Sequence, residues 1–208
     1  MPKITYDVCL LAFNAKKKTM AVELRKNRAI TMQSSTQFNR IAVVLHWLMA
    51  LMIVILLFVG SQILEPMANS NPEKLTPLQG HSILGVITGL LLILRYLNIK
   101  LRGKPHEASE KGSMRDNIAN WAHKLIYLLL IAVIGTGMTM AVEADFASIF
   151  AGTSVMPENF NHLSTRLAHG IFTKLLVLVL LIHIAAALYH QFILKDHLLR
   201  RMRLKRFK

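Results

Sequence analysis

Cysteine is almost absent from this chain, and acidic side chains are scarce. Cys9 is the one cysteine among 208 residues, which excludes a disulfide framework within the chain and any cysteine-ligated zinc or iron–sulfur site. Asp and Glu number 11 against 25 Lys and Arg. No Ser-His-Asp set, P-loop or carboxylate pair points to hydrolytic chemistry. If the chain binds a metal, histidine must supply the ligands.

Hydrophobic residues are abundant instead, making up 53% of the chain. They come in blocks rather than in amphipathic stripes, which is typical of membrane proteins. Each block is long enough to cross a bilayer as a helix. The sequence therefore predicts an all-α membrane protein, a bundle of four transmembrane helices at about 41–64, 81–97, 121–142 and 166–191.

The basic residues predict how the bundle is oriented. Eight Lys and Arg precede the first block, seven lie from Arg95 to Lys124, and seven follow the last block. The two remaining connections contain one each, Lys74 and Arg166. By the positive-inside rule both termini and the middle loop are cytoplasmic, in a bacterial inner membrane. The net charge of +14 then reflects topology and contact with lipid headgroups, and we expect no nucleic-acid partner.

The chain divides into three parts on this interpretation. Residues 1–36 form a cytoplasmic extension without a signal-peptide core or cleavage site, and Met32 is an alternative start. Residues 37–194 form the transmembrane domain. Residues 195–208 form a basic cytoplasmic tail, which we expect to lie at the membrane interface.

Four histidines lie inside the hydrophobic blocks. His169 and His183 are 14 residues apart on one predicted helix, which places them about 21 Å apart and within roughly 40° of the same face. His46 and His183 both lie roughly 9 Å from the inner surface by helical rise. His81 and His169 both lie near the outer surface. The sequence thus predicts two pairs of facing histidines at two depths.

Two such pairs are what two stacked haem groups with bis-histidine ligation require. The absence of a CxxCH sequence agrees with haem b, which is bound non-covalently. A single histidine in a membrane helix could instead pack through a hydrogen bond or relay protons. By the same helical rise, His123 and His190 are predicted to lie at the inner interface. Hydrogen bonding at the interface is the favoured role for both, and a role as an alternative ligand or in a quinone site is the other. The other three histidines are expected in solvated loops or the tail: His106, His162 and His197.

Two basic residues and two glycines are further candidates near these histidines. Arg95 and Lys174 are candidates for neutralising haem propionates, although Arg95 could equally snorkel to the headgroups. Gly85 and Gly89 share a helix face with His81. They would either let a porphyrin approach the helix or serve helix packing, and both interpretations are open.

Four motifs carry a resemblance that covers about residues 37–205. They are LHWLMAL at 45–51, GHSILG at 80–85, AHKLIYLLL at 122–130 and HGIFTKLLVLVLLIHIAAALYHQFILKD at 169–196. In these the chain resembles the bacterial cytochrome b561 family, dihaem four-helix proteins of the inner membrane. The resemblance implies the same four iron ligands, with His46 paired with His183 and His81 with His169.

The resemblance also implies a function, electron transfer through two b haems to or from the quinone pool. Some members look like superoxide oxidases, which pass an electron from superoxide to ubiquinone. Two alternatives are open: a membrane-anchor cytochrome b subunit of a dehydrogenase or hydrogenase complex, and a non-haem transporter or scaffold with histidines as proton or metal sites. The sequence does not indicate the oligomeric state.

Overall fold

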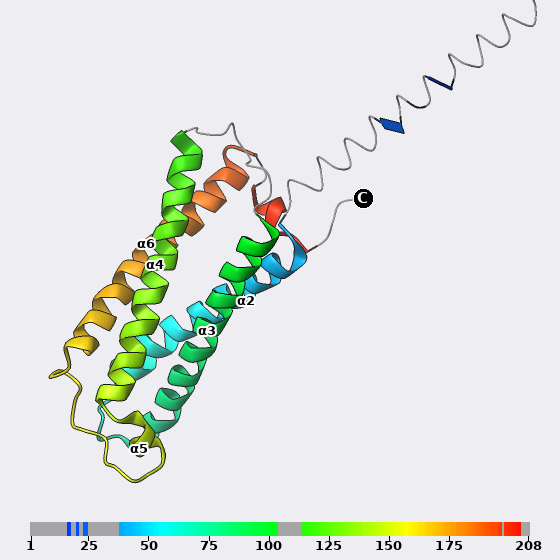
Figure 1. The fold of residues 1–208 in the computed structure, drawn as a ribbon. Coiled ribbons are helices and arrows are strands. Elements are labelled where there is room, and N and C mark those ends of the chain that lie inside the picture. Colours follow the sequence, from blue (N-terminus) through cyan, green and yellow to red (C-terminus); the bar gives the residue numbers. More distant parts are fainter. Residues whose placement is uncertain are drawn as a thin grey trace, which may run out of the picture.

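The computed structural model describes residues 38–103, 114–196 and 198–204, together with residues 16–17, 20 and 23–24. Within these ranges the chain is helical and forms no strand. Four segments are long and apolar enough to cross a membrane, which confirms the predicted all-α bundle of four spans (Figure 1). Of residues 1–36, only the five given above are described, so the hypotheses about this segment and about Met32 lie outside the described residues. His106 and His197 also lie outside them.

The first span begins at a side-chain cap and ends in a wider helix. Asn39 accepts a hydrogen bond from the Ala42 amide at 2.9 Å, which satisfies an amide at the start of α2 (Arg40–Phe58). The span continues as the π-helix η1 (Val59–Leu64). There the Glu65 amide donates to the Gly60 carbonyl five residues back, at 2.9 Å. Such π-helical turns are rare and frequently lie at functional sites.

The other spans are longer than the sequence predicted. The second comprises a 3₁₀ turn, η2 (Pro72–Lys74), and α3 (Leu75–Arg102), so it starts before the predicted residue 81. Pro77 lies in the first turn of α3, where a proline costs no hydrogen bond. The remaining spans are α4 (Met114–Glu143) and α6 (Ser164–Phe192).

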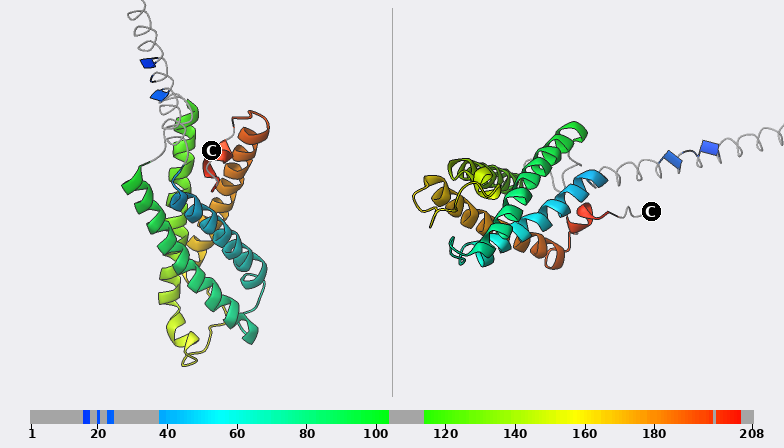
Figure 2. Two further views of the ribbon diagram at one scale, coloured as in Figure 1. Left: turned by 90° about the vertical axis from the view of Figure 1, so that its right-hand side faces the viewer. Right: turned by 90° about the horizontal axis from the view of Figure 1, so that it is seen from below.

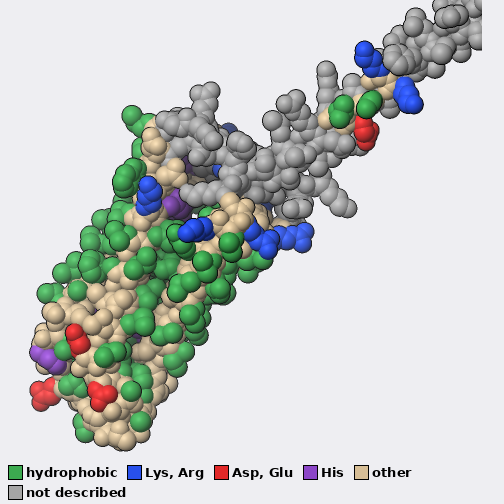
Figure 3. Space-filling view, in the orientation of Figure 1, with side chains coloured by type: hydrophobic (Ala, Val, Ile, Leu, Met, Phe, Trp, Pro, Cys, Tyr) green, Lys and Arg blue, Asp and Glu red, His purple; other side chains and the backbone are tan. Residues whose placement is uncertain are grey.

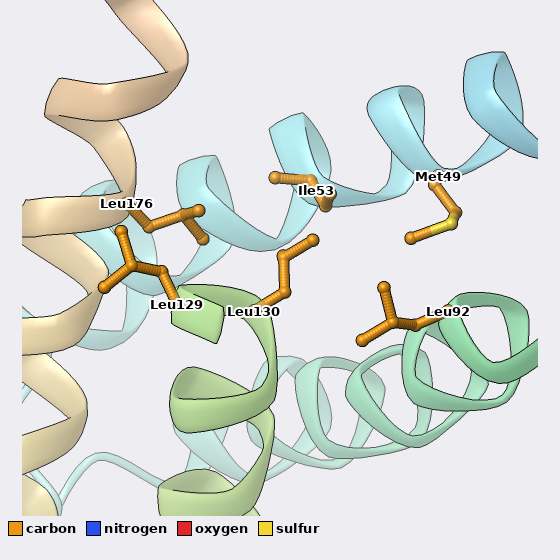
Figure 4. Close-up of a cluster of buried hydrophobic side chains, with 6 residues drawn as sticks. All are labelled: Met49, Ile53, Leu92, Leu129, Leu130 and Leu176. Atoms are coloured by element: carbon orange, nitrogen blue, oxygen red, sulfur yellow. The ribbon is translucent and has the colours of Figure 1, made fainter. Parts of the chain in front are cut away.

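The centre of the bundle is an apolar cluster to which every span contributes. Helix α2 packs against α3, α3 against α4, and α4 against α6. Figure 4 shows the buried side chains that meet between them: Met49, Ile53, Leu92, Leu129, Leu130 and Leu176. Leu176 is 2% exposed. We call this set the central cluster.

A second apolar cluster closes the end of the bundle at which α5 (Phe146–Phe150) lies. Leu78, Phe146, Ile149 and Phe160 are buried there. Asn69 donates to the Pro157 carbonyl at 2.8 Å and ties the two connections together. The connection between α4 and α6 therefore forms a packed cap.

At the opposite end the C-terminal tail returns to the first span (Figures 1 and 2). The 3₁₀ helix η3 (Leu198–Met202) lies beside the start of α2. Trp47 donates from its indole nitrogen to the Met202 carbonyl at 3.0 Å, and the Phe38 amide donates to the Arg201 carbonyl at 3.3 Å. The predicted interfacial tail thus contacts α2 directly.

Candidate functional site

Interior histidines gather at two levels, one on each side of the central cluster. The level of His81 and His169 lies toward α5, and the level of His46 and His183 lies toward the tail. These levels are called outer and inner after the predicted topology. All four side chains are partly buried. The separation of 14 positions from His169 to His183 on α6 sets the levels about 21 Å apart.

At the outer level the two histidines face each other from α3 and α6. Their ring centroids are 6.4 Å apart, and the ring planes differ by 76°. Two metal–nitrogen bonds of about 2 Å each, plus the short distance from each nitrogen to its ring centre, give a separation of about 6 Å. The spacing therefore fits one iron atom between the two rings.

His169 is held in place by helix α4. Its Nδ1 lies 2.9 Å from the Val133 carbonyl oxygen and 3.3 Å from the Thr136 hydroxyl. A carbonyl can only accept, so Nδ1 carries the hydrogen and Nε2 keeps the lone pair that binds a metal. A methyl group on Gly137 would come within 3.2 Å of His169 Cε1, so the ring packs directly against the α4 backbone.

His81 has a different environment. Gly60 of the π-helix lies beside it, so that a methyl group added to Gly60 would be 3.4 Å from His81 Cε1. Its Nδ1 is buried and has no hydrogen-bond partner among the described residues. A buried polar atom without a partner is unusual in proteins and often marks a functional position.

The inner level contains His123, which was predicted at the inner interface, in addition to His46 and His183. The ring centroids of His123 and His183 are 5.4 Å apart, with planes at 74°. His46 lies within electrostatic range of both. His123 donates from Nδ1 to the Ala119 carbonyl at 2.7 Å. The structure therefore brings His123 to the inner level on an exposed part of α4, beside His183.

Arg95 is a buried cation at the inner level. It donates from Nη1 to the Ala42 carbonyl at 2.7 Å and from Nε to the Tyr127 hydroxyl at 3.1 Å. The side chain is 8% exposed and lies within electrostatic range of His46. Snorkelling to the headgroups is therefore the wrong interpretation of Arg95, because its guanidinium group points into the bundle.

The remaining candidates are more peripheral. Lys174 is exposed on α6, and His162 is exposed in the connection before α6. His190 pairs through Nδ1 with the Asp196 carboxylate near the end of α6. A methyl group on Gly89 would contact Ile134 at 3.4 Å, which favours helix packing for this residue. A methyl group added to Gly85 would meet nothing within 4 Å, so there is room beside α3 at this residue.

The donor set suits haem better than a bare metal ion. In the described parts of the chain no three His, Cys, Asp or Glu side chains are grouped so that they could hold an ion. Haem iron needs two axial ligands from the protein, because the porphyrin supplies the others. A facing pair of imidazoles, as at the outer level, meets that requirement.

A membrane bundle with facing interior histidines at the spacing of axial ligands defines the class of membrane cytochromes b. Residues 37–204 match the model of the prokaryotic cytochrome b561 family, so the chain belongs to this family, as the sequence motifs predicted. The chain is similar to cytochrome b562 of Cereibacter sphaeroides, with 28% identity over 169 residues that cover 79% of this chain and 94% of the relative. No solved structure matches it significantly. The protein is therefore a multi-pass membrane protein of a haem-b electron-transfer family.

Three contacts at the outer level were not predicted from the sequence. They involve Gly60, the Val133 carbonyl and Gly137. Any residue supplies a carbonyl, so Val133 left no signal in the sequence. Glycines in transmembrane helices do signal close approach, but the partner of each becomes evident only once the helices are packed.

Proposed function

We propose that the protein is a dihaem cytochrome b of the bacterial inner membrane that exchanges electrons with the quinone pool. His46 and His183 bind the inner haem, and His81 and His169 bind the outer haem. The observation that carries the proposal is the 6.4 Å separation of the His81 and His169 rings. The haem groups supply one-electron chemistry, while the protein supplies position and electrostatics.

Basic side chains would balance the charge of the haem propionates. Arg95 suits the inner haem, because it is buried near His46 and its protein partners are neutral oxygen atoms. Lys174, five residues after His169 on α6, is the candidate for the outer haem. Charged groups inside a membrane protein need such partners to offset their desolvation.

The charge distribution supports cytoplasmic termini. Asp and Glu side chains gather at the α5 end of the molecule, and Lys and Arg at the other end (Figure 3). Basic residues face the cytoplasm in most membrane proteins. The inner haem and the tail would then lie toward the cytoplasm, and the packed α5 cap toward the outside.

Ubiquinone is the proposed exchangeable electron acceptor, close to the inner haem. Two histidines near the tail end of the bundle are candidates for its binding. His123 is exposed on α4 beside His183, and His190 is paired with Asp196 at the end of α6. A protonated imidazole can donate a hydrogen bond from its second ring nitrogen to a quinone oxygen, and a carboxylate partner can support proton transfer.

Superoxide as the outer electron donor is a second candidate, and Arg166 favours it. The Arg166 side chain lies against Gly170: its Nη1 would be 3.5 Å from a methyl group added to that glycine. The Arg166 charge also acts on His169. A cation beside the outer haem would attract a small anion. The acidic side chains exposed at this end oppose that attraction: Glu65, Glu73, Glu143, Asp145 and Glu158.

The test is to purify the protein in detergent and record the reduced-minus-oxidised spectrum together with the haem-to-protein ratio. We expect two b haems per chain, and about one in His183→Ala, with His162→Ala as the control that keeps both. A colourless protein would contradict the proposal and favour the non-haem transporter. Co-purification of a dehydrogenase or hydrogenase would favour the anchor subunit.

Reduction of the haem by enzymatically generated superoxide, abolished by superoxide dismutase, would support superoxide as the outer electron donor.

A further inference from the structure

We propose that the two ligands of the outer haem are unequal: His169, held by α4, anchors the haem, and His81 is a weaker ligand that can be replaced. This inference rests on the proposed haem between the two side chains. It assigns a positioning role to the Val133 carbonyl, Thr136 and Gly137, none of which contacts the iron.

The first step of the argument is the hydrogen bond of His169. Donation from Nδ1 to the Val133 carbonyl at 2.9 Å fixes the tautomer and the ring orientation. It also raises the basicity of Nε2, because the bond moves electron density into the ring. A more basic imidazole binds iron more tightly. The Thr136 hydroxyl, 3.3 Å from the same nitrogen, donates to the Ala132 carbonyl at 2.7 Å and so belongs to the same arrangement.

The second step is the lack of any such bond at His81. To bind iron through Nε2, His81 must carry its hydrogen on Nδ1, and that atom is buried with no acceptor among the described residues. The Gly60 carbonyl accepts from the Glu65 amide at 2.9 Å, as the π-helix requires, and no hydrogen bond joins it to His81. His81 therefore gains no basicity from a neighbour, and holding it in place carries the penalty of an unmet buried donor.

The third step is the packing around each ring. A methyl group on Gly137 would lie 3.2 Å from Cε1 and 3.3 Å from Nδ1 of His169. The equivalent distances from Gly60 to the same atoms of His81 are 3.4 and 4.0 Å. His169 is thus in closer contact with backbone on the side of its hydrogen bond. His169 is therefore held by its own helix and by two contacts with α4, while His81 is held by its own helix and one looser contact.

The experiment compares His81→Ala with His169→Ala in the full-length protein purified in detergent. We expect His81→Ala to keep close to two haems per chain, one of them five-coordinate and high-spin. That haem should bind carbon monoxide when reduced, and its low-spin spectrum should return when imidazole is added. We expect His169→Ala to retain about one haem per chain and to bind no carbon monoxide. His162→Ala is the control for changes unrelated to ligation.

Equal loss of haem from the two variants, or greater loss from His81→Ala, would overturn the inference. If His183→Ala still loses one haem, the dihaem proposal stands and the inequality alone has failed. If the unaltered protein contains no haem, or if neither outer variant changes its spectrum, the proposed function has failed as well.

A second comparison does not depend on removing a ligand. Gly137→Ala should displace the ring of His169 and lower the content of the outer haem by half or more. Gly135→Ala on the same helix is the matched control, because its added methyl group would meet nothing within 4 Å. Identical haem content and spectra for these two variants would contradict the anchoring role of α4.

Discussion

Arg95 is placed to act on the proposed inner haem without binding its iron. Its side chain lies between three helices, and its acceptors are the Ala42 carbonyl and the Tyr127 hydroxyl, which are neutral. A positive charge in an apolar interior is poorly screened. It would therefore favour the reduced state of the proposed inner haem, since reduction adds a negative charge.

We predict that Arg95→Gln lowers the midpoint potential of the inner haem by an amount on the order of tens of millivolts, because the glutamine removes the charge at similar length. Lys100→Gln, an exposed position on the same helix, is the control. A redox titration followed by visible absorbance measures the effect. A shift confined to the outer haem would contradict the placement of Arg95.

At the same scale, the sequence predicted which histidines lie at the same depth but not which rings are in contact. Helical rise alone placed His81 level with His169, and their rings are 6.4 Å apart. Depth could not show that the ring of His123 lies 5.4 Å from that of His183, because that distance depends on the rotation of α4 about its axis. Rotation is fixed by packing in the central cluster, which is a property of all four helices together.

Helix ends were the least predictable elements. Hydropathy marks where a chain enters the hydrocarbon layer, but a helix continues beyond that boundary wherever water can solvate its side chains. This explains why α3 begins at Leu75 and α4 at Met114, both among polar residues. The π-helix η1 has no marker in the sequence, and α5 is a short helix within the connection between the last two spans.

The tail gives a prediction at the scale of elements. Trp47→Phe keeps an aromatic ring but removes the hydrogen bond to the Met202 carbonyl, which is worth about 0.5–1.5 kcal/mol. We expect trypsin to cleave the tail about 2- to 10-fold faster in this variant, at Arg200, Arg201 or Arg203. Mass spectrometry of timed digests in detergent measures the rate. Trp121→Phe on α4 is the control, and an unchanged rate in Trp47→Phe would contradict a role for this contact.

The whole molecule is polarised from end to end, and its orientation can be tested directly. In a Cys9→Ser background, Ser70→Cys at the α5 end should react with a membrane-impermeant maleimide added to intact cells. Lys100→Cys at the tail end should react only after the cells are opened. Both positions are exposed, so access to solvent does not differ between them. The reverse pattern would show that the termini lie outside.

The central cluster has an energetic consequence for a protein in an energised membrane. It contains apolar side chains, so in the proposed dihaem arrangement an electron that passes from the outer to the inner haem would cross a layer that no counter-ion enters. The histidine levels are about 21 Å apart along α6, roughly two-thirds of a hydrocarbon layer of about 30 Å. With the interior negative, inward transfer then works against about 1.5 kcal/mol for every 100 mV of membrane potential. The distribution of electrons between the two haems would therefore respond to voltage, and each inward transfer would add to the charge across the membrane.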